Sequence, residues 1–170
     1  NIFDSSIAAF HVANAAAART TGVEFDVDFA ATDELTLRGS VAYNDAKYTD
    51  YVGGCWAGQT PAQGCNLQPN GAGVFQTQNL SGTRLQLAPE WALTAGFSYS
   101  LPISNGLALD WNVDGRYSSS YPLYPQQRPD AVQGGFFTID AGLTLHSDDD
   151  RWAVSFIGRN LTNEVVLLSA

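Results

Sequence analysis

Two cysteines are the residues of this 170-residue chain whose type and spacing point most directly to chemistry. Cys55 and Cys65 stand ten positions apart in a segment rich in Gly, Gln, Asn and Pro. We favour a disulfide over free thiols or metal ligands, because the sequence contains no Cys-x-x-Cys and no neighbouring histidine. In the chain-entropy model, closing so short a loop stabilises it by roughly 3 kcal/mol.

The two histidines do not complete a recognisable catalytic set. His146 ends an alternating segment on its polar side beside a turn, so we interpret it as a solvated turn residue. Ser98 and Ser155 are conceivable nucleophiles, but no spacing joins either of them to a histidine and an acid. Asp148–Asp150 lack the ligand spacing of an EF-hand. We therefore expect no enzymatic activity, no metal site and no cofactor.

Carboxylates also recur at every second position in one segment. On a strand, Glu24, Asp26 and Asp28 would lie on one face, about 7 Å apart. Such a row could bind a cation or do acid–base chemistry, but we favour a hydrated wall that pairs with Arg38 across a tight turn. The other charged residues expected on polar, lumen-facing sides of strands are Asp110, Asp114, Arg116 and Asp140.

Composition limits the class of protein that these residues serve. With 45% hydrophobic and 15% charged residues, the chain is apolar enough to order itself, and its length suits one domain. The 17 acidic and 8 basic residues give a net charge of −9, which argues against nucleic acid as a partner. The sequence has no apolar run of about 18 residues, so we expect no transmembrane helix, but transmembrane strands are not excluded.

Hydrophobic and polar residues alternate with period two along most of the chain, which predicts strands. A weaker pattern makes 2–12 a possible seventh strand, and we interpret the Ala-rich stretch 13–18 as a loop. The six predicted strands are Gly22–Phe29, Leu35–Tyr43, Trp91–Tyr99, Leu107–Tyr117, Phe137–His146 and Arg151–Asn160. The residues predicted to share one apolar, lipid-facing side are Val23, Phe25, Leu37, Phe97, Trp111, Leu143 and Phe156.

The connections between these strands alternate in length. Those at 32–34, 102–106 and 147–150 are short, whereas 49–83 and 121–135 are long. This alternation places the long loops at one end of an up-and-down antiparallel sheet, as in outer-membrane barrels with short periplasmic turns.

Alternation alone does not separate a membrane barrel from a β-sandwich. Three features favour the barrel: strands of about 10–14 residues against a usual 5–6, opposite charges on the polar faces, and aromatic residues near strand ends. The aromatic residues are Tyr43, Tyr48, Tyr51, Trp91, Tyr99, Tyr117, Tyr121 and Trp152. We predict an all-β fold, an antiparallel up-and-down transmembrane β-barrel segment that this chain alone does not close.

An ordered set of short motifs resembles the late barrel of TonB-dependent outer-membrane receptors. Asn14-Ala15 and Ala18–Glu24 resemble the lead into a descending strand of that family, and Leu35–Tyr48 resembles the strand that follows. Gly82–Leu85 and Ala88–Trp91 resemble the entry to the next descending strand, and Asn160–Asn163 the end of the penultimate one. Together these motifs cover nearly the whole chain in family order.

The resemblance implies a C-terminal slice, residues 1–170, of a larger receptor, with the plug domain and the final strand absent. The family imports scarce nutrients such as ferric siderophores, cobalamin, haem or oligosaccharides across the outer membrane of Gram-negative cells. The implied partners are outer-membrane lipid, the remaining barrel and plug, TonB acting through the plug, and a small-molecule nutrient. Candidate ligand contacts in the long loops are Trp56, Tyr121, Tyr124 and Arg128, with Gln126 and Gln127 beside them.

Two alternatives remain open from the sequence. One is a complete small outer-membrane barrel that acts as an anchor or adhesin. The other is a soluble β-sandwich that binds carbohydrate through its loop aromatics.

Overall fold

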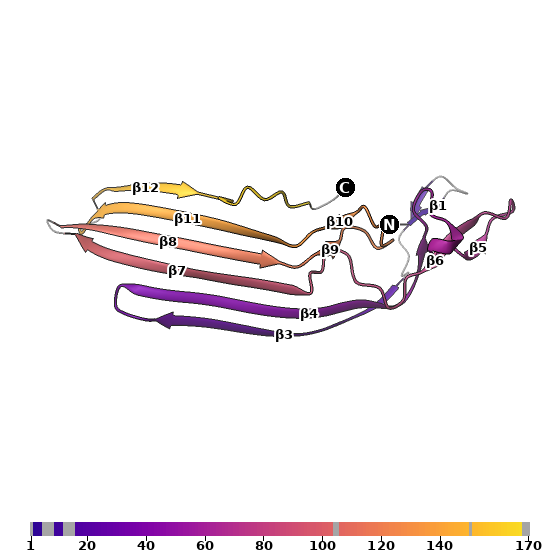
Figure 1. The fold of residues 1–170 in the computed structure, drawn as a ribbon, viewed down its shortest axis with the longest axis horizontal. Coiled ribbons are helices and arrows are strands. Elements are labelled where there is room, and N and C mark those ends of the chain that lie inside the picture. Colours follow the sequence, from indigo (N-terminus) through magenta and orange to yellow (C-terminus); the bar gives the residue numbers. More distant parts are fainter. Residues whose placement is uncertain (1, 5–8, 12–15, 104–105, 150, 168–170) are drawn as a thin grey trace.

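A computed structural model describes residues 2–4, 9–11, 16–103, 106–149 and 151–167. Six long strands dominate it (Figure 1). They are β3 (Ala16–Ala30), β4 (Leu35–Gly54), β7 (Trp91–Ile103), β8 (Leu107–Ser118), β11 (Phe136–Ser147) and β12 (Ala153–Gly158). The short elements are β1 (Ile2–Asp4), β2 (Ala9–His11), the 3-10 turn η1 (Pro61–Gln63), β5 (Leu67–Pro69), β6 (Phe75–Asn79), β9 (Tyr121–Pro122) and β10 (Val132–Gln133).

The long strands pair in sequence order, and each pair is antiparallel. Among the described residues, β3 pairs only with β4 and β12 only with β11, so the sheet does not close on itself. The predicted up-and-down, open barrel segment is confirmed. A complete small barrel would need β3 and β12 to pair with each other, and they do not.

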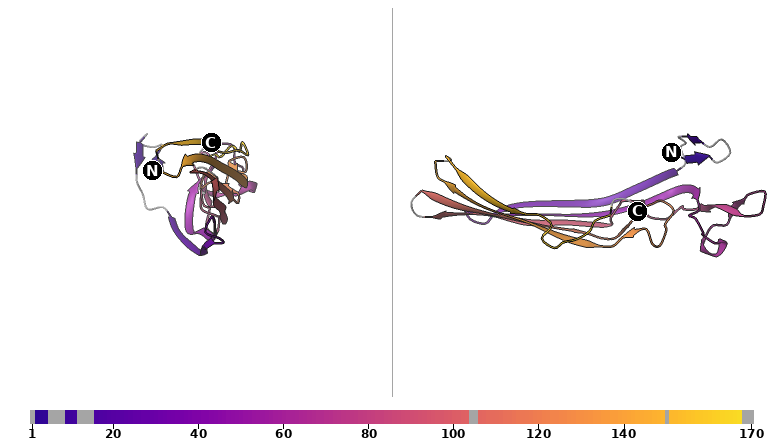
Figure 2. Two further views of the ribbon diagram at one scale, coloured as in Figure 1. Left: turned by 90° about the vertical axis from the view of Figure 1, so that its left-hand side faces the viewer. Right: turned by 90° about the horizontal axis from the view of Figure 1, so that it is seen from above.

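The sheet forms a single layer rather than two facing sheets (Figure 2). A β-sandwich buries the inner faces of two sheets against each other, and the described part of the chain has no second large sheet. Within the same described ranges, no helix is long and apolar enough to cross a membrane.

The connections are arranged as predicted. The three tight turns lie together at one end of the sheet, and the long connections with β5, β6, β9 and β10 lie at the other (Figure 1). The first turn is closed locally, because the Thr32 hydroxyl accepts hydrogen bonds from the backbone N–H groups of Glu34 and Leu35. We call the tight-turn side the turn end and the opposite side the loop end.

Three sequence predictions about strand boundaries were wrong. The residues of β1 and β2 pair only with each other, so 2–12 does not add a seventh strand to the main sheet. Ala16–Ala18 begin β3 instead of belonging to a loop, whereas 13–15 lie outside the described residues. Strand β4 runs to Gly54 rather than ending at Tyr43, because hydrogen bonds to β3 and β6 hold its outer half. The sequence pattern did not predict this half, because it carries no apolar stripe.

Most of the buried apolar residues that the structure describes lie in the loops rather than in the sheet. Leu80, Cys65, Leu123 and Ala131 are among the most buried apolar residues, and all of them lie in the long connections. On the sheet, by contrast, Phe25 is 61% exposed and the side chains of many other large apolar residues are also open. The sheet is therefore not stabilised by a core of its own.

Candidate functional site

The apolar face of the sheet is continuous from β3 to β12. Strand register aligns Phe25 with Val41, Leu93, Tyr117 and Phe137 in one row across the strands. A second row joins Leu37, Phe97, Val113, Ala141 and Gly158, and a third joins Tyr99, Trp111, Leu143 and Phe156. The prediction that seven named apolar residues share one face is thus confirmed.

Aromatic residues border this face at two levels. At the loop end, the rings of Tyr43 and Trp91 lie 4.9 Å apart, and Tyr117 lies nearby on β8. Towards the turn end, Tyr99 stands directly opposite Trp111. From Trp91 to Tyr99, eight residues at about 3.3 Å each span about 26 Å along the strand, close to the roughly 25 Å apolar band of outer-membrane barrels.

Three aromatics predicted for these levels lie elsewhere. Tyr48 and Tyr51 lie on the outer extension of β4, beyond Tyr43, with their rings 4.7 Å apart. Tyr121 is 7% exposed and packs with Leu123 and Ala131 in a small loop cluster. The positions of Tyr48 and Tyr51 were missed because the predicted end of β4 was too early. The position of Tyr121 was missed because the sequence does not show how its loop folds.

On the opposite, polar face, one ion pair spans three strands. The Arg38 Nε and one terminal nitrogen donate to Asp114 Oδ1 and Oδ2, each at 2.9 Å. The other terminal nitrogen donates to the Ser98 hydroxyl at 2.7 Å. Gly96 of β7 lies between the two charged residues, and a Cβ there would stand 2.6 Å from Asp114 Oδ1. The missing side chain therefore leaves the space that the pair occupies.

This pair corrects the predicted partner of Arg38. Asp28 does lie opposite Arg38 in the register, but the guanidinium bonds to Asp114, two strands away. The carboxylates of Glu24, Asp26 and Asp28 stay exposed on the outermost strand. Of the remaining predicted polar-face residues, Arg116 lies between Thr94 and Thr138, and Asp140 accepts a hydrogen bond from the Asn160 N–H at 2.7 Å.

A second correction concerns His146, which is half-buried rather than solvated. Its Nε2 lies 3.1 Å from Asp110 Oδ2, and the Ser100 hydroxyl donates to Asp110 Oδ1 at 2.7 Å. The acid thus stands between the serine and the histidine, whereas a hydrolytic triad places the histidine in the centre. The two serines considered as nucleophiles bond elsewhere, Ser98 to Arg38 and Ser155 to Thr144.

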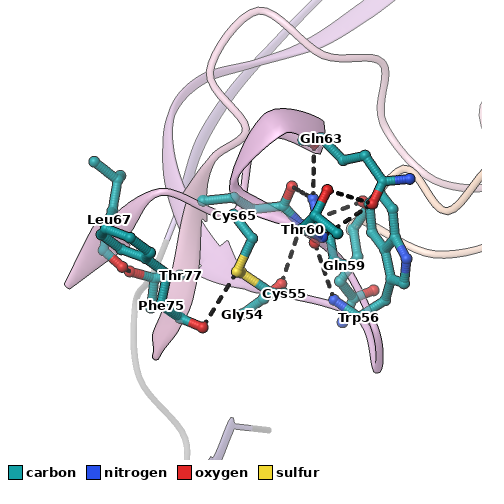
Figure 3. The surroundings of a disulfide bond; sticks show 12 residues. Gly54, Cys55, Trp56, Gln59, Thr60, Gln63, Cys65, Leu67, Phe75 and Thr77 are labelled. Atoms are coloured by element: carbon teal, nitrogen blue, oxygen red, sulfur yellow. Dashed lines mark hydrogen bonds between the residues drawn. A yellow bond between two sulfur atoms is a disulfide. The ribbon is translucent and has the colours of Figure 1, made fainter. Parts of the chain in front are cut away.

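The predicted disulfide between Cys55 and Cys65 is present, with the two Cα atoms 5.7 Å apart (Figure 3). The bond closes a segment that contains η1 and the side chains of Gln59 and Gln63. The Gln59 side chain accepts from the Trp56 N–H at 3.1 Å and donates to the Gln63 carbonyl at 3.0 Å. Trp56 is half-buried in this segment.

The other three candidate ligand contacts differ in accessibility. Tyr121 is buried and Tyr124 packs against the same cluster, so neither projects freely. Arg128 is exposed and bonds to Asp130 through Nε and a terminal nitrogen. The hydrogen bond between them raises the pKa of Arg128 and lowers the pKa of Asp130. Burial of the two tyrosines was missed because the sequence does not show how the loop folds back on itself.

A hollow of about 610 Å³ opens mainly on the polar face just below the long loops. Leu87, one of the residues that line it, has φ of 55°, which is unusual for a large side chain. Glu24 and Asn44 supply the polar groups of the hollow, and Leu87 and Pro89 supply apolar surface. This mixture suits a small molecule that has both polar and apolar parts.

Comparison with known proteins supplies the family. Residues 2–161 match the family model "TonB dependent receptor-like, beta-barrel". The fold is similar to that of FyuA, the ferric yersiniabactin uptake receptor of Yersinia pestis, with a TM-score of 0.66 and 16% identity. The match covers 89% of this chain and 19% of that receptor, so the chain spans about a fifth of the receptor's length. No curated protein matches the sequence. On the family-model match, this chain belongs to the TonB-dependent receptor-like β-barrels.

Proposed function

We propose that this chain forms part of the barrel wall of an outer-membrane transporter that imports a scarce nutrient with energy supplied through TonB. The observation that carries the proposal is the open, single-layer sheet with one exposed apolar face and one polar face. Such a sheet has no core of its own and needs lipid on one side and water on the other.

In this proposal the apolar face meets outer-membrane lipid, with its aromatic residues at the two membrane surfaces. The polar face lines the lumen and includes Glu24, Asp26, Asp28, Arg38, Asp110, Asp114, Arg116 and Asp140. The tight turns face the periplasm and the long loops face the outside. The chain transports rather than catalyses, and Gram-negative cells carry it in the outer membrane.

The edges of β3 and β12 support the proposal that this chain is a slice of a larger barrel. In lipid, each unpaired backbone group costs several kcal/mol, so both edges need partner strands. We propose that the rest of the receptor supplies them and that a plug domain, which contacts TonB, fills the lumen. From the resemblance of its motifs, we place the chain in the later, C-terminal part of that barrel.

We place the substrate in the ferric siderophore class, with cobalamin, haem and oligosaccharides as the alternatives. The support is the name of the similar receptor, which takes up ferric yersiniabactin, together with the mixed polar and apolar hollow below the loops. Trp56 and Arg128 would contact the ligand from outside, and Leu87 and Glu24 would contact it at the lumen mouth.

Uptake by cells that depend on the complete receptor tests this function. Iron-starved cells are given a panel of ⁵⁵Fe-loaded siderophores, with ⁵⁷Co-cobalamin, haem and labelled oligosaccharides in parallel. We expect uptake of one ferric siderophore in the strain with TonB and none in the strain without it. Uptake that is equal in both strains would contradict active transport, and uptake of another nutrient alone would contradict the substrate class.

A further inference from the structure

The two long connections are bonded to each other outside the main sheet. We call residues 55–90 loop 1 and residues 119–135 loop 2. The Leu87 N–H of loop 1 donates to the Pro122 carbonyl at 2.9 Å. The Arg84 guanidinium donates to the Ser120 carbonyl at 2.8 Å, and the Gln127 amide donates back to the Arg84 carbonyl at 2.8 Å. Arg84 is therefore bonded to loop 2 through both its side chain and its main chain.

A buried glutamine makes a further connection. The Gln78 side chain is on the short strand β6 and the residue is 5% exposed. Its amide nitrogen donates to the Gly54 carbonyl at 3.2 Å and to the Gln126 carbonyl of loop 2 at 3.3 Å. Its oxygen accepts from Gln59 at 2.7 Å. One amide thus connects β4, loop 2 and the segment that the disulfide closes.

The two loops differ in what supports them. Loop 1 is built on β4, which continues to Gly54 and pairs there with β6. Loop 2 contains only β9 and β10, with two residue pairs between them, and a cluster of three buried side chains. So small a unit has few contacts of its own to hold its position.

We propose that loop 1 and loop 2 move as one body, in which Gln78 and Arg84 position loop 2 on the outer extension of β4. A rearrangement at the loop end then displaces both loops together. A disturbance of the disulfide-closed segment reaches loop 2 through Gln59 and Gln78. The proposal concerns the mechanics of the loops and holds whichever molecule the receptor transports.

Hydrogen exchange on the complete receptor, without ligand, tests this coupling. In loop 2, the Leu123 N–H donates to the Ala131 carbonyl and the Ala131 N–H donates to Arg128. In the Gln78→Ala, Arg84→Ala double variant, we expect both amides to exchange at least 10-fold faster, although neither residue has changed. The matched control is Gln76→Ala, which removes an exposed glutamine from the same strand. It should change these rates less than twofold.

Barrel amides of the paired strands β4 and β7 report whether the variants have folded. If these remain protected and loop 2 exchanges at the wild-type rate, the loops are independent and the proposal is overturned. If the double variant does not assemble, Gln78→Glu replaces it, because a carboxylate keeps the side-chain shape but does not donate to Gly54 or Gln126. Exchange in loop 2 should then rise severalfold, and an unchanged rate would overturn the proposal.

Discussion

Arg38 and Asp114 form a bidentate ion pair although their strands, β4 and β8, do not pair with each other. The guanidinium crosses β7 at Gly96, where there is no side chain to obstruct it. Both charged groups are partly exposed, so the pair itself contributes no more than about 1 kcal/mol. The pair can form only if the strand between its two residues has an open position, which Gly96 provides. This steric requirement on the sequence is stricter than the small energy of the pair suggests.

We therefore expect Gly96→Ala to destabilise the receptor by about 1–3 kcal/mol. The new Cβ would stand 2.6 Å from both Asp114 Oδ1 and the Val113 carbonyl oxygen, so the backbone as well as the ion pair must shift. Gly142→Ala is the control, because a Cβ there meets nothing within 4 Å. Urea unfolding of the detergent-solubilised receptor measures both. Equal stability of the two variants would contradict the role of Gly96.

The two sheet faces should respond differently to a new charge. Val113 lies between the aromatic levels of the apolar face, two residues from Trp111 and four from Tyr117, so Val113→Arg should hinder membrane assembly by about 2–4 kcal/mol. Asn112→Arg places the same charge on the polar face of the same strand and should be tolerated. Trp111→Arg, at the turn-end aromatic level, should cost less than Val113→Arg because the penalty falls towards the interface.

The heat-modifiable band on gels, which reports the folded barrel, measures assembly of these three variants. If Val113→Arg and Asn112→Arg are equally harmful, both faces are packed against protein and the proposed lipid-facing side is wrong.

The disulfide should be complete in the protein isolated from cells. Maleimide labelling of the denatured, unreduced receptor should modify neither Cys55 nor Cys65, and labelling after reduction should modify both. Replacing both residues with serine should destabilise loop 1 by roughly 3 kcal/mol, seen as faster proteolysis between β4 and β6. Two reactive thiols before reduction would refute the bridge.

The carboxyl of Asp130 should titrate below its ordinary pKa, because the Arg128 guanidinium donates hydrogen bonds to the charged form. A lowered pKa in the folded state means that the pair stabilises loop 2 above the ordinary pKa of aspartate. This contribution is lost as the pH falls through the folded-state pKa. Arg128→Gln should raise the pKa of Asp130 towards its ordinary value, as followed by ¹³C NMR of labelled aspartate.

Salt provides the control for that titration. Because Arg128 and Asp130 are exposed, 1 M NaCl should reduce the difference between wild type and Arg128→Gln. A pKa of Asp130 that is the same in both proteins at low salt would show that the hydrogen bonds are not maintained in solution.

Local patterns in the sequence determined much of this architecture. Alternation identified six strands and the apolar face that includes Phe25 and Phe97, because side chains on a strand point to alternate sides whatever the strand pairs with. The alternation of short and long connections predicted the up-and-down order and the position of the loops. Two cysteines close together in one loop predicted the bridge between Cys55 and Cys65.

Only the tertiary structure decided which residues meet across strands and between loops. The partner of Arg38 depends on the register of three strands and on the missing side chain of Gly96, and the Asp110 contact of His146 depends on the register of β8 and β11. Neither register is visible within a single strand. The burial of Tyr121 depends on how loop 2 folds back on itself, and the contact of Gln78 with Gln126 depends on how the two loops pack together. These contacts join residues far apart in sequence, whereas periodicity reports only on neighbours along the chain.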